Sequence, residues 1–253
     1  MNIEKLYFKN RDGMNLSAQL DLPREEKPEA YALFANCFTC AKNLKAITYI
    51  SRSLVAEGIA VLRFDFTGLG NSEGDFADTN ISSNVEDFIH ASEFLESYYE
   101  APKILIGHSL GGTIALMAAE YITSSRAVAI INTPSEPAHL LLHFKGKRKE
   151  IEEKGEAEIS IAGRTFRIKK QLVDNLEQSL IQVKIRNLRK ALLILHSPVD
   201  RVVGVDNATN IFEMAKHPKS FVSLDRADHL LSNKSYSLYV GGLIATWAKK
   251  YIN

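Results

Sequence analysis

The sequence predicts an α/β fold with a mostly parallel, twisted sheet of about eight strands and helices on both faces. Short apolar runs, suited to strands buried on both faces, alternate with segments of helical spacing along most of the chain. This alternation is typical of parallel strands joined by crossover helices. The length of 253 residues suits one α/β domain, so we expect residues 1–253 to form a single domain.

The predicted elements follow in chain order. Two extended segments at residues 5–9 and 16–22 flank the turn residues Arg11-Asp12-Gly13, which predicts an antiparallel pair before the parallel sheet. We then expect strands at 31–35, 59–66, 103–107, 127–131, 191–195 and 220–224, with helices at 46–57, 82–95, 112–121, 207–216 and 235–251.

One stretch, residues 137–190, lacks the alternation. Residues 145–158 are dense in charge of both signs, and two alternating segments at 158–161 and 165–168 flank Ala162-Gly163-Arg164 like a hairpin. Long insertions between regular elements are often lids or binding loops. We therefore expect residues 137–190 to form a lid or cap insertion, the alternative being a surface excursion with no role.

Composition excludes some classes of function. The chain has 31 Lys plus Arg and 30 Asp plus Glu, a net charge of +1, which argues against bulk nucleic-acid binding. No segment approaches about 18 uninterrupted apolar residues, and no signal peptide is visible at the start. Two cysteines are typical of a reducing compartment. We expect a cytoplasmic protein without nucleic-acid or membrane partners.

The segment Gly107-His108-Ser109-Leu110-Gly111 matches G-x-S-x-G. Alone this pattern is weakly specific, but here a buried strand precedes it and an alanine-rich helix follows it. A nucleophile elbow requires this strand, tight turn and helix, with the serine hydroxyl exposed on the turn. The sequence therefore predicts Ser109 as a catalytic nucleophile, the alternative being a glycine-rich turn with a passive serine.

A serine hydroxyl needs a base to remove its proton. Among the seven histidines, only His229 lies between the last predicted strand and the last helix, as the order Ser, acid, His requires. His196, at the end of an earlier strand, is the second choice. His108 lies within the elbow, and we expect its side chain to point away from the nucleophile.

The acid that orients His229 should follow the strand at 191–195. Asp200 is the first carboxylate after that strand, whereas Asp206 is better placed to cap the next helix. We therefore predict a catalytic triad of Ser109, Asp200 and His229.

Acyl transfer also needs N–H donors for the tetrahedral oxyanion. The backbone N–H of Leu110, directly after the nucleophile, should be one donor. The second should come from the loop 36–40, where we favour the N–H of Phe38 and keep that of Cys37 as the alternative.

Other motifs do not indicate a cofactor. Cys37 and Cys40 form C-x-x-C, which leaves a redox role open, although small buried side chains are the default interpretation. Neither four zinc ligands nor H-E-x-x-H is visible, and the glycines 68, 70 and 74 do not fit G-x-G-x-x-G. We expect no cofactor and no metal.

With these motifs in this order, the chain resembles the α/β-hydrolase family over nearly its whole length. Residues 36–40, 63–70 and 217–221 also resemble the hydrolase half of bacterial proteins that fuse such a hydrolase to an OsmC-type peroxide-reductase domain. In those fusions a second domain would follow the last helix, whereas this sequence stops at Asn253. Many family members have His-Gly where this chain has Asn36-Cys37, which leaves the shape of the oxyanion loop open.

The resemblance implies a cofactor-free serine hydrolase that cleaves carboxylic esters with small to medium acyl chains, a carboxylesterase acting on a small-molecule ester. Thioesterase, peptidase, acyltransferase and C–C hydrolase are alternatives on the same triad. A non-catalytic binding protein and a thiol redox partner are alternatives of other classes. Haloalkane dehalogenases and epoxide hydrolases are disfavoured because their nucleophile is a carboxylate. A homodimer is left open.

Overall fold

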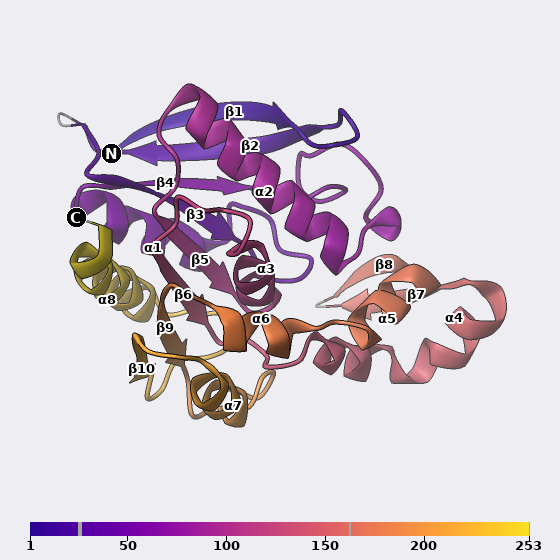
Figure 1. Cartoon of the computed structure of the whole chain (residues 1–253). Helices are drawn as coiled ribbons and strands as arrows, with labels where there is room; N and C mark the ends of the chain where they lie inside the picture. Colours follow the sequence, from indigo (N-terminus) through magenta and orange to yellow (C-terminus); the bar gives the residue numbers. More distant parts are fainter. Residues whose placement is uncertain (25–26, 162, 253) are drawn as a thin grey trace.

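A single eight-stranded sheet organises the chain. Figure 1 shows the computed structural model, which describes residues 1–24, 27–161 and 163–252. The strand order is β1-β2-β4-β3-β5-β6-β9-β10. The pairs β1–β2 and β2–β4 are antiparallel, and every other neighbouring pair is parallel. The predicted α/β fold, with its antiparallel start, is confirmed.

The strands keep close to their predicted positions. The antiparallel pair is β1 (Asn2–Lys9) and β2 (Asn15–Leu22). The parallel strands are β3 (Ala30–Ala35), β4 (Ile59–Phe64), β5 (Ile104–His108), β6 (Ala127–Ile131), β9 (Ala191–His196) and β10 (Lys219–Ser223). Strand β4 ends two residues before the predicted end at 66, because the Asp65 carboxylate accepts hydrogen bonds from the backbone N–H groups of Lys42 (2.6 Å) and Asn71 (3.0 Å) in a turn.

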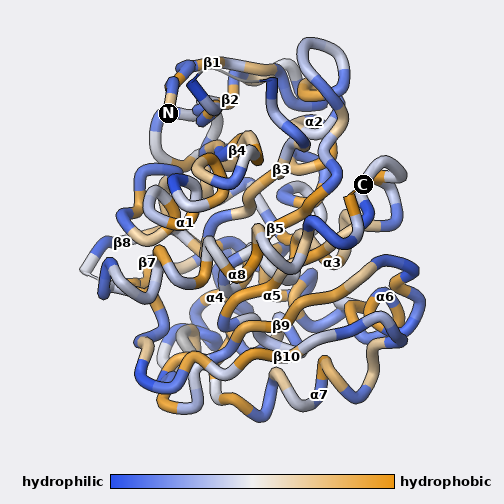
Figure 2. Tube along the Cα trace, turned by 90° about the vertical axis from the view of Figure 1, so that its left-hand side faces the viewer, coloured by the Kyte–Doolittle hydropathy of each residue, from blue (hydrophilic) through white to orange (hydrophobic). Residues whose placement is uncertain are grey.

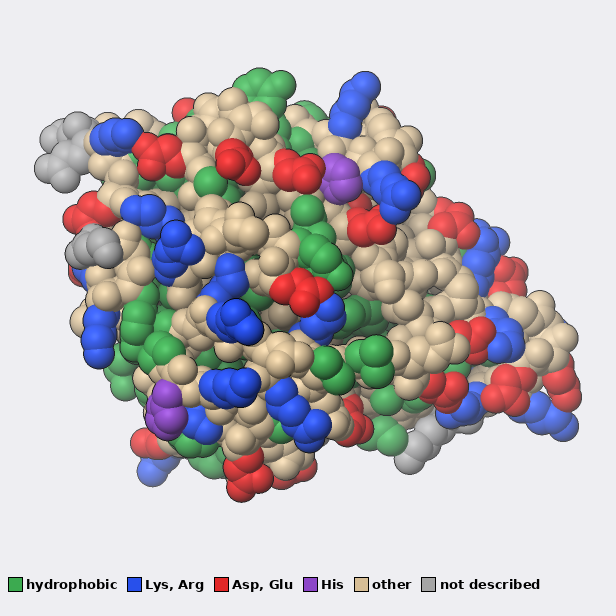
Figure 3. Space-filling view, in the orientation of Figure 1, with side chains coloured by type: hydrophobic (Ala, Val, Ile, Leu, Met, Phe, Trp, Pro, Cys, Tyr) green, Lys and Arg blue, Asp and Glu red, His purple; other side chains and the backbone are tan. Residues whose placement is uncertain are grey.

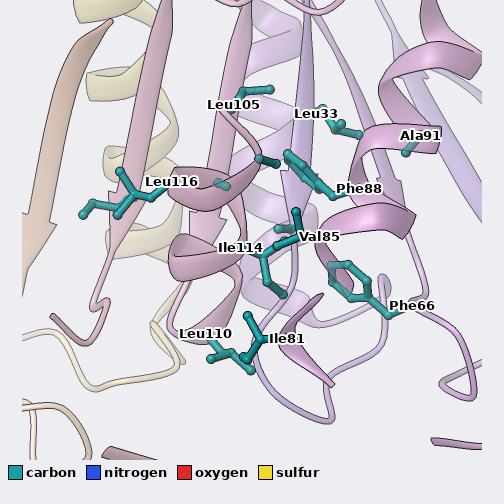
Figure 4. Packing of buried hydrophobic residues seen from close by; sticks show 14 of the residues in the cluster. Leu33, Phe66, Ile81, Val85, Phe88, Ala91, Leu105, Leu110, Ile114 and Leu116 are labelled. Atoms are coloured by element: carbon teal, nitrogen blue, oxygen red, sulfur yellow. The ribbon is translucent and has the colours of Figure 1, made fainter. Parts of the chain in front are cut away.

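Helices cover both faces of the sheet. One face carries α1 (Lys45–Ala56) and α8 (Lys234–Ile252), and the other carries α2 (Ile81–Tyr98), α3 (Leu110–Ala118) and α7 (Asp206–Met214). Successive strand side chains serve opposite faces: Leu33 and Leu105 pack with α2 and α3 (Figure 4), whereas Phe34 and Ile106 pack with α1 and α8. The central strands are therefore apolar along their length, as the orange traces of β3, β5 and β9 show in Figure 2.

The insertion between β6 and β9 has more secondary structure than the sequence predicted. It contains η2 (Pro137–Lys147), α4 (Arg148–Lys154), β7 (Glu156–Ile161), β8 (Arg164–Lys169), α5 (Lys170–Glu177) and α6 (Ile181–Asn187). Strands β7 and β8 form the predicted antiparallel hairpin, although Ala162 in its turn lies outside the described residues. The short helices escaped prediction because dense charge masks their apolar positions.

Charges of both signs lie side by side where α4 forms the outer end of the molecule (Figure 3). Arg148 pairs with Glu152, and Lys154 pairs with Glu150, within that helix. The apolar side of the insertion faces inward. Its side chains belong to the same buried cluster as α2 and α3, namely Phe144, Ile151, Ile159, Phe166, Ile168, Leu172, Val173 and Leu176. The insertion therefore packs on the face of the sheet that holds α3. Its role as a lid stays a prediction.

Candidate active site

Ser109 lies in a strained turn between β5 and α3. Its backbone has φ 54° and ψ −123°, in the left-handed range that non-glycine residues rarely adopt. The amide of Ser109 donates to the carbonyl of Ile131 (2.8 Å), and its own carbonyl accepts from Gly112 (2.9 Å). Helix α3 begins directly after the serine, at Leu110 rather than at the predicted Gly112. The turn thus places the hydroxyl at the helix N-terminus.

Three glycines make this turn sterically feasible. A Cβ on Gly111 would lie 2.2 Å from the carbonyl oxygen of Ala35, on the neighbouring strand β3. A Cβ on Gly107 would lie 2.2 Å from the carbonyl oxygen of Gly111, and one on Gly112 would lie 2.0 Å from Thr133 Oγ1. All three distances are far below ordinary contact, so the elbow leaves no room for a side chain at these three positions.

His229 reaches Ser109 from the loop between β10 and α8. Its Nε2 lies 3.1 Å from Ser109 Oγ, and its Nδ1 lies 2.7 Å from Asp200 Oδ2. An ionised carboxylate can only accept a hydrogen bond. In the neutral imidazole, Nδ1–H therefore donates to Asp200, and Nε2 is the acceptor for the serine hydroxyl. The structure brings together all three residues predicted for the triad.

Asp200 is held in its ionised form. Its Oδ1 accepts the backbone N–H groups of Val202 (2.8 Å) and Val203 (3.0 Å), while Oδ2 accepts His229. Burial alone would raise the pKa of this carboxyl group. The hydrogen bonds from His229 and the two amides outweigh burial, so the pKa lies below its ordinary value. Asp200 is thus a fixed negative partner for the imidazole.

Two residues outside the triad hold the His229 loop, and sequence reasoning missed this role. The backbone carbonyl of His229 accepts His108 Nε2 (2.7 Å) and Asn132 Nδ2 (3.0 Å). Burial and the neighbouring His229 lower the pKa of His108 to about 4, so its ring is neutral near pH 7. Asn132 has φ 47°, and its Oδ1 accepts the amide of Ser197 (3.0 Å). These contacts act on a backbone carbonyl, which leaves no signal in the sequence pattern.

The second-choice histidine has a different environment. His196 is fully buried, its Nε2 donates to the carbonyl of Val203 (2.9 Å), and the same atom lies 4.0 Å from Asp200 Oδ2. Burial lowers its pKa. His196 therefore packs behind the loop that carries Asp200, whereas His229 is the histidine in contact with Ser109.

The predicted oxyanion donors lie around one small cavity. Leu110 is the first residue of α3, and the N–H groups of a first helical turn have no partner within the helix. Phe38 and Cys37, on the loop after β3, line the same cavity as Leu110. Because Cys37 and Phe38 both line this cavity, the choice of the Phe38 N–H as the second donor stays a prediction.

The cysteines of this loop form a disulfide bond, whereas the default expectation was two separate side chains. The Cα atoms of Cys37 and Cys40 lie 5.2 Å apart, within the range that a disulfide can bridge. A turn in which the amide of Cys40 donates to the carbonyl of Cys37 (3.0 Å) brings them together. Thr39, between them, has φ 62°. The loop is therefore a compact, covalently closed turn.

The insertion contacts this loop directly. Arg164 Nη1 on β8 donates to the carbonyl of Thr39 (3.1 Å), and its guanidinium lies 4.8 Å from the centre of the Phe166 ring. Phe166 packs on Phe76 of η1 (Phe76–Asp78), with ring centres 5.0 Å apart, and Phe76 packs on Phe38 at 5.5 Å. The β7–β8 hairpin, η1 and the oxyanion loop are thus linked by successive contacts between aromatic rings.

The described part of the chain shows no group of three or more His, Cys, Asp or Glu side chains placed to hold a metal ion. None of its described helices is long and apolar enough to cross a membrane. The predicted cytoplasmic location stays a prediction.

Comparison with known proteins agrees with the α/β fold. A sequence model described as the alpha/beta hydrolase family matches residues 33–233, from strand β3 past His229. The chain belongs to the alpha/beta hydrolase family. The narrower resemblance to OsmC-type fusion proteins stays a prediction.

Solved structures and curated proteins resemble the chain to different degrees. The esterase domain of a Rhodothermus marinus protein is 46% identical, with a TM-score of 0.81, and the match covers 100% of both chains. Est1E from Butyrivibrio proteoclasticus, solved with ferulic acid bound, has 19% identity and a TM-score of 0.79 over 98% of this chain and 99% of its own, and it shows the fold alone. The mitochondrial palmitoyl-protein thioesterase ABHD10 of Mus musculus is 26% identical over 70% of this chain and 61% of its own length. The Rattus norvegicus protein of the same name is 34% identical over 39% of this chain and 33% of its own length. The chain therefore spans between a third and three fifths of the length of these two curated relatives.

Proposed function

We propose that the protein is a serine hydrolase that cleaves carboxylic esters through an acyl-enzyme intermediate. One observation carries the proposal: a single imidazole, His229, is hydrogen-bonded to Ser109 Oγ on one side and to Asp200 Oδ2 on the other. A nucleophile, a base and an acid that orients the base are the parts that acyl transfer requires.

The steps follow from these hydrogen bonds. His229 Nε2 takes the Ser109 proton as the hydroxyl oxygen attacks the ester carbonyl carbon, and Asp200 stabilises the imidazolium that forms. The same Nε2–H then protonates the departing alcohol, which leaves an acyl group on Ser109. In the second half, His229 removes a proton from water, the resulting hydroxide attacks the acyl carbon, and the proton returns to Ser109 as the acid is released.

The oxyanion formed in both halves needs donors already in place. Leu110 N–H at the start of α3 is one donor, and Phe38 N–H is our choice for the other. The positive end of the helix dipole favours the same negative charge. The disulfide-closed turn and the Arg164 contact to Thr39 hold the loop that carries Phe38.

We assign oxygen esters with small to medium acyl chains as substrates, which makes the protein a carboxylesterase. The esterase domain of the Rhodothermus marinus protein, at 46% identity over the whole chain, supports this choice. A thioesterase is the second candidate, because the curated relatives are named palmitoyl-protein thioesterases. Peptidase and acyltransferase chemistry would use the same three residues.

The test replaces the nucleophile. Ser109→Ala should lower turnover of p-nitrophenyl acetate and butyrate by about 10⁵-fold or more. The matched control is Ser53→Ala, since Ser53 lies on α1, on the opposite face of the sheet. Turnover that persists in Ser109→Ala would sink the triad assignment.

Two further measurements separate the alternatives. A fluorophosphonate probe should label the wild type and the Ser53→Ala control but not Ser109→Ala, whereas a non-catalytic binding protein would not be labelled at all. Oxygen esters and thioesters with matched acyl groups of graded length separate the two hydrolases. A higher kcat/KM for the thioester than for the oxygen ester of the same acyl group would assign a thioesterase instead.

A further inference from the structure

A second cavity lies at the end of the sheet opposite the triad. Its volume is about 430 Å³, within the range of pockets that hold small ligands. Arg126 and Lys190 line it and directly precede β6 and β9, whereas Asp200 follows β9 and Ser109 follows β5. The amide of Ala191 donates to the carbonyl of Arg126 (3.0 Å), so the starts of β6 and β9 lie side by side. The cavity is therefore separate from the candidate active site.

The walls of this cavity come from α3, from α6 and from the segments that follow these helices. Leu116 and Leu188 are its buried apolar part. Thr123, Ser125 and Asn187 add polar groups. On this face of the molecule, Lys and Arg side chains gather around α6 (Figure 3). The cavity thus combines a small apolar wall with a polar and basic rim.

Positive charge is in excess around the cavity. Four of its lining residues are cationic, and a single one, Glu120, is anionic. Glu120 forms an ion pair with Lys184. The other three cations, Arg126, Arg189 and Lys190, form no ion pair with a carboxylate in the part of the chain that the structure describes. Three positive charges therefore border the cavity without a counter-ion.

Lys190 is held in this basic environment by neutral groups. Its Nζ donates to the carbonyl of Ile122 (2.7 Å), to the carbonyl of Ser125 (2.8 Å) and to Ser125 Oγ (2.6 Å). These contacts use all three N–H groups of the ammonium but bring no negative charge. Burial and the neighbouring Arg126 lower the pKa of Lys190 to about 8. An anion in the cavity would relieve this cost of holding positive charges together away from water.

The donors that remain suit a phosphate group. Arg126 uses one N–H group, from Nη1 to the carbonyl of Thr123 (3.1 Å), and a guanidinium has five. Arg126 and Arg189 therefore keep donors for a ligand, in the forked geometry that matches phosphate oxygens. A phosphate monoester carries close to two negative charges at about pH 8, which matches three cations better than a carboxylate does. The volume also exceeds what a phosphate group alone would fill.

We propose that this cavity binds a phosphate monoester of a small polyhydroxylated molecule, such as a sugar phosphate or the ribose phosphate of a nucleotide. Arg126 and Arg189 hydrogen-bond the phosphate oxygens, and Lys190 contributes its charge. Thr123 and Asn187 bind hydroxyl groups of the organic part. The site does not depend on the proposed ester hydrolysis, so its test measures binding directly.

The experiment is isothermal titration calorimetry at low salt and about pH 8, with ribose 5-phosphate, AMP, ribose and inorganic phosphate as probes. Ribose 5-phosphate should bind one-to-one with a Kd below about 1 mM, at least about tenfold more tightly than inorganic phosphate, and ribose should not bind. Tighter binding of AMP than of ribose 5-phosphate would assign a nucleotide, and weaker binding a sugar phosphate. Equal affinity for inorganic phosphate and ribose 5-phosphate would show a general attraction of anions and overturn the proposal.

Variants locate the site. Arg189 is exposed, so Arg189→Gln should fold, and it should raise the Kd for ribose 5-phosphate about tenfold. Arg126→Gln, which keeps an N–H donor for Thr123, should have a similar effect. Arg186→Gln is the matched control, because Arg186 is exposed on α6 and does not line this cavity, and the net charge changes equally. An unchanged Kd in both cavity variants, or an equal loss in the control, would overturn the proposal.

Proton uptake gives an independent readout at Lys190. Their ion pair lowers the pKa of Glu120 and raises that of Lys184, and arginines stay charged, so Lys190 is the cavity residue that titrates near pH 8. A bound phosphate would raise the pKa of Lys190 and cause proton uptake, so binding enthalpies should differ between Tris and HEPES buffers. Lys190→Arg should bind without this difference. Equal enthalpies in the wild type would place the ligand away from Lys190 and overturn the assignment.

Discussion

Replacing His108 by glutamine tests how the loop that carries His229 is held. His108 is 2% exposed, and its Nε2 donates to the carbonyl of His229 over 2.7 Å. The two rings lie 5.2 Å apart between centres, and Asp200 and Asp228 are the charged groups nearby that favour protonation of His108. Glutamine keeps a neutral N–H donor of similar reach but cannot gain a proton.

The expected loss of stability at low pH follows from the pKa of His108. Burial lowers the pKa of His108 from its ordinary value of 6.5 to about 4 in the folded protein. As the pH falls below about 6.5, the unfolded chain therefore takes up a proton that the folded chain does not, and stability falls. The loss is complete near pH 4, and the difference between 6.5 and about 4 corresponds to roughly 3 kcal/mol of unfolding free energy.

The assay is urea denaturation of the wild type and His108→Gln between about pH 4 and pH 7.5, followed by circular dichroism. Groups other than His108, including the buried His196, are common to both proteins and cancel in the comparison. The wild type should lose roughly 3 kcal/mol more than the variant across this range. If the unfolding free energies of the wild type and of His108→Gln change by the same amount over this pH range, the assignment of a neutral, buried His108 is refuted.

Two further substitutions test the turn and the insertion. Gly111→Ala places a methyl group 2.2 Å from the carbonyl oxygen of Ala35, so it should destabilise the fold by about 3 kcal/mol and abolish ester turnover; a thermal unfolding midpoint equal to that of the wild type would contradict the close packing. Arg164→Ala removes the hydrogen bond to Thr39 and the contact with Phe166, so it should lower kcat/KM for esters several-fold with little change in stability. An unchanged kcat/KM would show that the insertion does not influence the oxyanion loop.

Much of the fold, and the proximity of Ser109, Asp200 and His229, could be predicted from the sequence. Strands buried on both faces are continuously apolar, so β3, β5 and β9 stand out as short apolar runs. Parallel strands end at one edge of a sheet, which is why chain order alone placed Asp200 and His229 near Ser109. Their catalytic roles remain our proposal.

The features that escaped prediction depend on contacts between distant segments. His108 and Asn132 both donate to the backbone carbonyl of His229, and only the folded chain brings these distant segments together. The helices of the insertion are short, and ion pairs such as Arg148 with Glu152 cover their outer sides. Their apolar positions therefore lack the length at which a helical period stands out.

The bond from Arg164 to the Thr39 carbonyl gives the insertion a thermodynamic link to the loop for which we predict an oxyanion donor. One position of the hairpin favours one geometry of the oxyanion loop, and coupling between two sites is reciprocal. A change at Arg164 would therefore reach the loop that carries Phe38 through the backbone of Thr39, without touching Ser109, Asp200 or His229.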